Sequence, residues 1–171
     1  MSTSLLEHAL AHHVWATLKL IDACLELSSE QLQTAVPGTY GTILNTFQHL
    51  VAADASYLSV MMGHGGVDIG EGLDLPALRA QMERDAAAWP EWLAQDLDPG
   101  AILVRHRDDG SESRAPLGIR LAQVLHHGTD HRSQICTALT TLGIQPPEID
   151  VWDYASHVGL LSETEPAAPT A

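Results

Sequence analysis

Two histidines, His127 and His131, lie four residues apart in a segment with helical periodicity. An α-helix has 3.6 residues per turn, so this spacing places both imidazoles on one face, where they can meet a single ion. Apolar residues continue the same stripe: Leu117, Leu121, Val124, Ile135, Ala138 and Leu142. Burying an imidazole without a partner costs roughly 1–3 kcal/mol, and a shared metal would satisfy both rings. Spacing alone leaves open the alternative that each ring is hydrogen-bonded separately.

A third metal ligand has to come from another segment. His49 lies midway along a second helical segment, and Asp54 competes with it, either as a ligand or as a hydrogen-bond acceptor behind one. His8 and His12 repeat the four-residue spacing, but on a face without an apolar stripe, so we expect them to be solvated. The remaining histidines are expected to make surface or local contacts: His13, His64, His106, His126 and His157.

Four long helical segments are predicted to position these side chains, at about 4–27, 42–62, from 74 onward, and 117–142. Pro90 should kink or shorten the third of them. Residues 101–115 alternate in polarity around an Asp-Asp-Gly turn, which predicts a short β-hairpin. Short helical turns are expected near 28–32 and 151–158. The predicted fold is all-α: a four-helix bundle, with the hairpin before the fourth helix and a short C-terminal helix.

We expect residues 1–160 to form one domain and residues 161–171, rich in Pro and Ala, to form a flexible tail. The formal charge is -14, with 8 Lys+Arg against 22 Asp+Glu, which disfavours nucleic acids and anionic membrane surfaces. No apolar run is free enough of polar groups to predict a membrane span. Without a recognisable export signal, a cytoplasmic protein is expected, with Cys24 and Cys136 reduced and filling small core spaces.

Two segments together resemble the DinB/YfiT-like family. The run 40–54 looks like the second helix of that family, and 125–135 resembles its His-x-x-x-His-Arg-x-Gln signature. The order of elements also agrees, and the resemblance covers about Leu5 to Tyr154. It implies a four-helix bundle whose metal is held by His49, His127 and His131. Asp130 and Ser133 stand where the family often has His and Gly; neither position is expected to touch the metal.

Three imidazole ligands would leave a fourth position for water or substrate, the pattern of a working metal site. Zinc is the first expectation, and Ni²⁺, Fe²⁺ or Mn²⁺ are alternatives because imidazole does not select among them. Arg132 and Gln134 flank the ligands and could orient an anion or a water, or could be ordinary surface residues.

The resemblance implies a thiol-dependent transferase acting on a small molecule with a low-molecular-weight thiol. One alternative is a metal-dependent hydrolase, with Asp54, Asp130 or Asp22 as nominal bases. Another is a non-catalytic metal-binding stress-response protein. A homodimer is a further expectation, because a helical bundle can leave apolar surface exposed.

Overall fold

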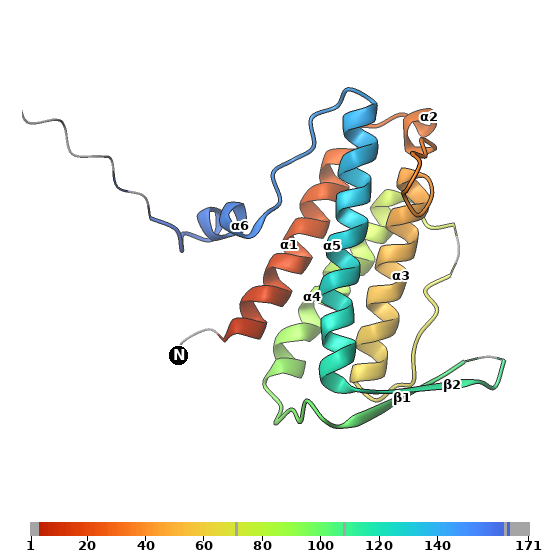
Figure 1. Ribbon diagram of the computed structural model, residues 1–171, viewed down its shortest axis with the longest axis vertical. Helices are drawn as coiled ribbons and strands as arrows, with labels where there is room; N and C mark the ends of the chain where they lie inside the picture. The colour runs from red at the N-terminus through yellow and green to blue at the C-terminus, as the bar shows by residue number, and fades with distance from the viewer. Residues whose placement is uncertain (1–3, 71, 108, 163, 165–171) are drawn as a thin grey trace, which may run out of the picture.

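The structure is a computed structural model that describes residues 4–70, 72–107, 109–162 and 164. Four long helices run side by side as a bundle (Figure 1): α1 (Leu5–Cys24), α3 (Ile43–Met61), α4 (Leu75–Leu93) and α5 (Leu117–Thr141). The smaller elements are the short helices α2 (Ser29–Leu32) and α6 (Val151–His157) and the antiparallel strands β1 (Ile102–His106) and β2 (Glu112–Pro116). The predicted four-helix bundle with a hairpin before its last long helix is therefore confirmed.

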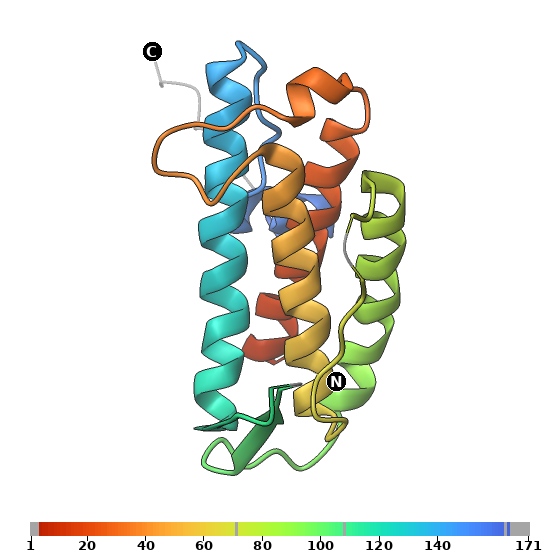
Figure 2. The ribbon, with the colours of Figure 1, turned by 90° about the vertical axis from the view of Figure 1, so that its right-hand side faces the viewer.

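Each long helix packs against two of the others. α1 contacts α4 and α5, and α3 contacts the same two helices from the opposite side. Figure 2 shows α3 between α5 and α4, with the loop before α3 crossing in front of α5. Side chains of α3 and α5 that contact each other therefore lie along one seam of the bundle.

The helix starts follow from local sequence. Ser4, Thr42 and Asp74 each accept a hydrogen bond from the backbone N–H three residues later, which satisfies a donor left open by the first helical turn. α5 has no side-chain cap. Instead the Leu117 N–H donates to the carbonyl of Ala101 at 2.8 Å, so the hairpin segment supplies the acceptor and fixes where α5 begins.

Pro90 was expected to kink or shorten its helix, but the helix is not shortened. α4 continues through it to Leu93. Trp89 and Trp92 flank the proline, are 4% and 1% exposed, and meet edge to face. The indole of Trp92 also donates to the Met61 carbonyl at 3.2 Å. Burying two indoles stabilises this turn by more than the hydrogen bond that proline removes.

The interior consists of two apolar clusters with a polar layer between them. One cluster includes Leu20, Phe47, Leu78 and Ile135, and the other includes Leu10, Leu58, Trp92 and Val124. The polar layer lies between them along every long helix: His13, Thr17, Asp54, Asp85 and Arg132. Polar groups at this depth need partners inside the protein, and hydrogen bonds among His13, Thr17, Asp54 and Arg132 join α1, α3 and α5 at mid-height.

Cys24 and Cys136 are both free thiols, and Cys24 is fully buried in the first apolar cluster, as expected for a core filler. Of the tail predicted to be flexible, residues 163 and 165–171 lie outside the described residues. None of the described helices combines the length and the apolar character that crossing a membrane requires.

Candidate metal centre

His49 from α3 and His127 and His131 from α5 meet at the seam between these helices. One ring nitrogen from each lies within 4.8 Å of the others, and the Nε2 atoms of His49 and His127 are 3.0 Å apart. A tetrahedral zinc site with Zn–N bonds of about 2.0–2.1 Å implies nitrogen separations of about 3.3 Å. Small side-chain rotations would bring the three nitrogens to that spacing. The donor set and its geometry therefore fit one transition-metal ion.

The hydrogen bonds of His131 assign its tautomer. Its Nδ1 lies 3.1 Å from Oε1 of Gln134, an oxygen that can only accept. Nδ1 must therefore carry the proton and donate, which leaves the lone pair of Nε2 for a metal. Gln134 is itself held, because the same oxygen accepts from the Tyr40 N–H at 2.9 Å. Gln134 thus orients the His131 ring and is more than a plain surface residue.

Burial keeps His49 and His127 neutral. It lowers the pKa of His127 to about 4, with a further contribution from the neighbouring His131. It also lowers the pKa of His49, again with His131 contributing. Both rings are therefore uncharged at neutral pH, and neutral imidazole is the form that binds a metal.

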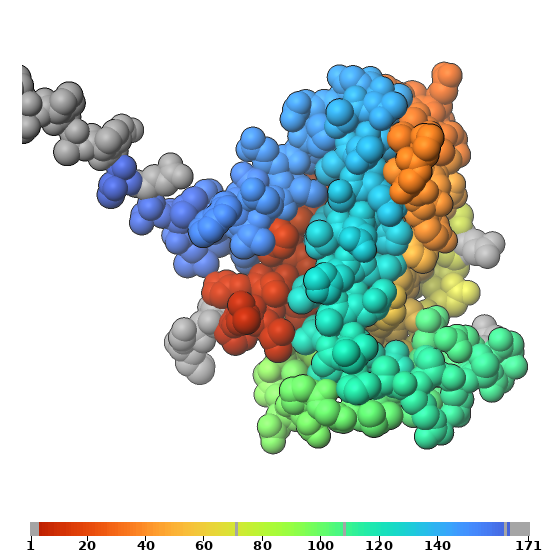
Figure 3. Space-filling view, viewed as in Figure 1, coloured from red at the N-terminus to blue at the C-terminus, as the bar shows by residue number. Residues whose placement is uncertain are grey.

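Tyr40 fixes the outer edge of the cluster. Its ring stacks on His49 with centroids 4.0 Å apart and planes inclined by 17°, and it meets His131 edge-on at 5.4 Å. Tyr40 lies in the loop between α2 and α3, which Figure 3 shows against the upper half of α5. On the other side, Tyr57 meets His127 edge-on at 5.7 Å. Two tyrosines therefore limit the rotation of all three histidine rings.

Two hollows adjoin the cluster, and His49 lines both. One, of about 680 Å³, lies between Tyr40, the first turns of α3 and the loop around Gly70. The other, of about 360 Å³, lies toward the hairpin and is lined by Ser56, Tyr57 and Arg105. A small molecule could therefore approach the histidines from either side, so the arrangement can leave one coordination position open.

Asp54 does not join the three histidines. Its Oδ2 accepts from Nε2 of His13 at 2.8 Å, and the two side chains are 2% and 1% exposed. Arg132 donates to Nδ1 of His13 at 3.1 Å, and also to the His13 carbonyl and the Thr17 hydroxyl. His13 thus bridges a guanidinium and a carboxylate as a neutral ring. Of Asp54 and His49, it is therefore His49 that lies within reach of His127 and His131.

His13 and Arg132 correct two expectations. His13 was expected to make surface or local contacts, and Arg132 to orient an anion or a water or to be an ordinary surface residue, yet they are 1% and 4% exposed. Burial lowers the pKa of Arg132 to about 10, with the charge of Asp54 acting in the opposite direction. A charged guanidinium so deep is tolerated because Asp54 offsets its charge and four acceptors satisfy its N–H groups. These residues join α1, α3 and α5 directly beneath the histidine cluster.

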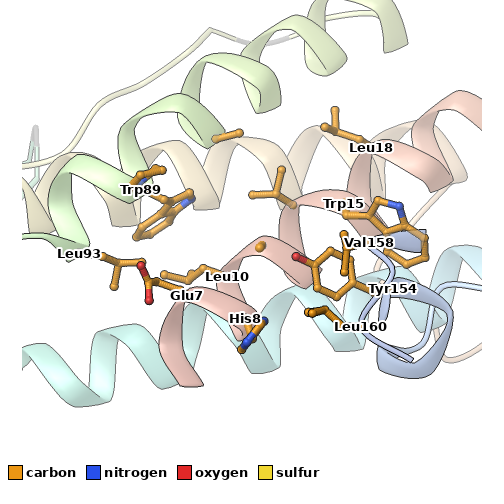
Figure 4. Close-up of a pocket in the computed structure, with 14 residues that line it drawn as sticks. Glu7, His8, Leu10, Trp15, Leu18, Trp89, Leu93, Tyr154, Val158 and Leu160 are labelled. Carbon is orange, nitrogen blue, oxygen red and sulfur yellow. The ribbon is translucent and has the colours of Figure 1, made fainter. Parts of the chain in front are cut away.

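The other candidates lie elsewhere. Asp22 pairs with Arg79 at 2.6 Å, and Asp130 and Ser133 are exposed on α5. His12 places its Nε2 2.9 Å from the Ile149 carbonyl. Within the described ranges, His49, His127 and His131 form the only group of three or more side chains that could hold a metal ion. His8 instead lines an apolar groove of about 590 Å³ between α1, α4 and the chain after α6 (Figure 4). No histidine of the cluster reaches that groove.

Tyr40, Tyr57 and His13 are the side chains around the centre that sequence patterns did not single out. His13 had a usable signal: it falls on the spacing Leu10, His13, Thr17, Leu20, which is the buried face of α1. The tyrosines had none, because stacking on a ligand depends on a loop whose path no periodicity describes.

Comparisons with known proteins agree with this architecture. The profile of the DinB family matches residues 1–165. A crystal structure of a DinB-like protein from Bacillus cereus is similar in fold, with a TM-score of 0.64 at 20% sequence identity, covering 85% of this chain and 95% of that one. The comparison with curated proteins finds no match. The family profile covers nearly all of the sequence, and the chain belongs to the DinB family.

Proposed function

We propose that this protein is a metal-dependent thiol S-transferase that holds one divalent metal through His49, His127 and His131. The supporting observation is the convergence of three imidazole nitrogens beside two hollows that a small thiol could enter. When bound, the metal supplies a cationic centre that lowers the pKa of a thiol and favours its thiolate at neutral pH. Zinc is the first choice, because a three-histidine site needs no redox support; Ni²⁺, Fe²⁺ and Mn²⁺ remain alternatives.

The three carboxylates that the sequence nominated as bases for a hydrolase are not free beside the cluster, which favours thiol chemistry over hydrolysis by those residues. Hydrolysis requires a general base within hydrogen-bond reach of the attacking water. Asp54 already accepts from His13, Asp22 is paired with Arg79, and Asp130 is exposed on the helix surface. A thiolate is itself the nucleophile and needs no such base. The chain's own residues then have to orient the ligand rings, which Gln134 and Tyr40 do.

The metal assignment is tested by elemental analysis of purified protein. We expect close to one metal per chain in the wild type and loss of most of it in His127→Ala and His131→Ala. His126→Ala is the matched control, since this neighbouring histidine is exposed and should leave the metal content unchanged. Wild-type metal content in the two ligand variants, with their helical circular dichroism intact, would overturn the site.

The thiol assignment is tested on cobalt-substituted protein. Adding a small thiol should change the cobalt absorption bands, because sulfur would replace an oxygen ligand. The same titration with the corresponding alcohol should leave the bands unchanged. A metal-loaded protein that responds to no common cellular thiol would instead be a hydrolase or a non-catalytic metal-binding protein.

A further inference from the structure

The smaller hollow beside the histidines contains an arginine without an evident structural task. This hollow, the Arg105 pocket, is lined by His49, Ser56, Tyr57, Asp68 and Arg105 and has a volume of about 360 Å³. It thus runs from a proposed metal ligand to a guanidinium on strand β1. Arg105 is partly buried, and no ion pair or side-chain hydrogen bond joins it to any residue that the structure describes.

A second guanidinium strengthens the positive charge there. Arg120 is 8% exposed, and it donates only to the backbone carbonyls of Leu103 and Ser113, which carry no charge to offset its own. Burial lowers the pKa of Arg120, and the nearby charge of Arg105 contributes in the same direction. In a chain with 8 basic and 22 acidic residues, two arginines without an ion-pair partner outnumber the one carboxylate of the pocket lining, Asp68, and leave a local positive charge.

Ser56, whose hydroxyl is buried, also lines this hollow. Ser56 is 4% exposed, and its Oγ has no hydrogen-bond partner among the described residues. Leaving a buried hydroxyl unpaired is unfavourable by roughly 1–3 kcal/mol, so a ligand that accepts from it would recover that free energy. Gly66 lies between these two side chains: a Cβ added there would lie 3.6 Å from Ser56 Oγ and 3.8 Å from Arg105 Cγ. The Ser56 side chain and the stem of the Arg105 side chain therefore lie close together at one side of the pocket.

We propose that the Arg105 pocket binds a carboxylate group of the substrate while the reacting sulfur lies at the histidine cluster, an inference that rests on the proposed function. A guanidinium and a planar carboxylate form two parallel hydrogen bonds, and Ser56 supplies a third donor. Asp68 lies exposed at the pocket, with its Oδ1 accepting from the Gly70 N–H at 2.8 Å. Its negative charge disfavours a dianion such as phosphate more than a singly charged carboxylate.

The carboxylate can be part of the thiol or of the second substrate, and two titrations of the cobalt-substituted protein distinguish these sources. The first compares 3-mercaptopropionate with the neutral 3-mercapto-1-propanol, monitored through the cobalt bands. The second adds propionate in the presence of the neutral thiol, monitored by calorimetry. Charge-assisted hydrogen bonds lead us to expect about tenfold tighter binding of the carboxylate thiol in the first case, or saturable propionate binding in the second.

Arg105→Gln should abolish the preference for the carboxylate while leaving the metal content and the binding of the neutral thiol unchanged. Arg107→Gln is the matched control: it makes the same charge change two residues along, at an exposed arginine that bonds Ser111 outside the pocket. A preference that survives Arg105→Gln, or one that falls equally in both variants, would overturn the proposal. So would the absence of any carboxylate preference in the wild type.

Failure of the proposed function gives a different result. If neither thiol alters the cobalt bands, thiol chemistry is wrong, and propionate calorimetry on the metal-loaded protein still decides the pocket. Binding that Arg105→Gln removes and Arg107→Gln retains would then support a carboxylate site beside another chemistry. No binding of propionate by the wild type in that experiment would refute the pocket as well.

Discussion

Replacing Gly128 with alanine is expected to destabilise the protein, although the same change stabilises most helices. Gly128 is buried in the middle of α5 and faces the polar layer. A Cβ at this position would lie 2.5 Å from Nδ1 of His13 and 2.9 Å from Nη1 of Arg132, and it would approach the imidazole Cε1 more closely still. Because atoms at rest in contact are about 3.5–4.0 Å apart, the His13 ring would have to move by about 1 Å.

That movement acts on hydrogen bonds with no substitute in the interior. His13 donates to Asp54 at 2.8 Å and accepts from Arg132 at 3.1 Å, and it is 1% exposed, so water cannot replace either partner. Hydrogen bonds to charged groups contribute about 1.5–3 kcal/mol each, while alanine regains about 1 kcal/mol of helix propensity. The free energy of unfolding should therefore fall by about 2–5 kcal/mol.

Urea and thermal unfolding measure this change. For a chain of this size the midpoint of thermal unfolding should drop by about 5–20 °C. Gly118→Ala is the matched control in the same helix, where the added Cβ would lie 3.3 Å from the carbonyl oxygen and 3.5 Å from the Cβ of Pro99; its stability should change by less than about 1 kcal/mol. If Gly128→Ala is as stable as the wild type, the described contact is wrong. A penalty that is undiminished in a His13→Ala background would show that His13 is not its source.

Three further outcomes follow from the structure. Burial raises the pKa of Asp85 to about 6. The folded state therefore binds this proton more tightly than the unfolded state does, and the resulting contribution to the free energy of unfolding is lost as the pH rises through 6. Asp85→Asn should therefore stabilise the protein at pH 8 by about 1–2 kcal/mol and have little effect at pH 4, as measured by urea unfolding. Cys24 is fully buried, which raises the pKa of its thiol to about 12, so mass spectrometry after labelling with a thiol reagent should find it unmodified until the protein unfolds. Tyr40→Ala should weaken metal binding by about 10-fold or more in a chelator competition, while Tyr40→Phe, which keeps the ring stacked on His49, should retain it.

The helices and the histidine pair of α5 could be predicted because both depend on local spacing. The pattern around His127 and His131 is contained within one helix, and α5 runs from Leu117 to Thr141, one residue short of the predicted end. The third ligand could not be derived this way, since the choice between His49 and Asp54 depends on what else each can bind. The Asp54 carboxylate is already hydrogen-bonded to His13, a residue 41 positions away on another helix.

The first helix shows why such a partner was missed. Its apolar residues recur at helical spacing, at Leu6, Leu10, Val14, Leu18, Ile21 and Leu25. Of these, Leu10 and Ile21 are buried, but Leu6 and Leu25 are 38% and 41% exposed. The face that is buried also carries His13 and Thr17. A hydrophobicity pattern counts these as surface residues, because their burial is favourable only when Asp54 and Arg132 satisfy them.

The central turns of α5 therefore serve two faces of the helix at once. Gly128 and Arg132 face inward, where they fit around His13, while His127 and His131 face the seam with α3 and meet His49. His131 and Arg132 are adjacent, so any shift of the inner contacts rotates the helix that carries two proposed ligands. The buried network can thus hold the imidazoles in position without touching the metal. On this argument Gly128→Ala should lower metal affinity along with stability, and Gly118→Ala should change neither.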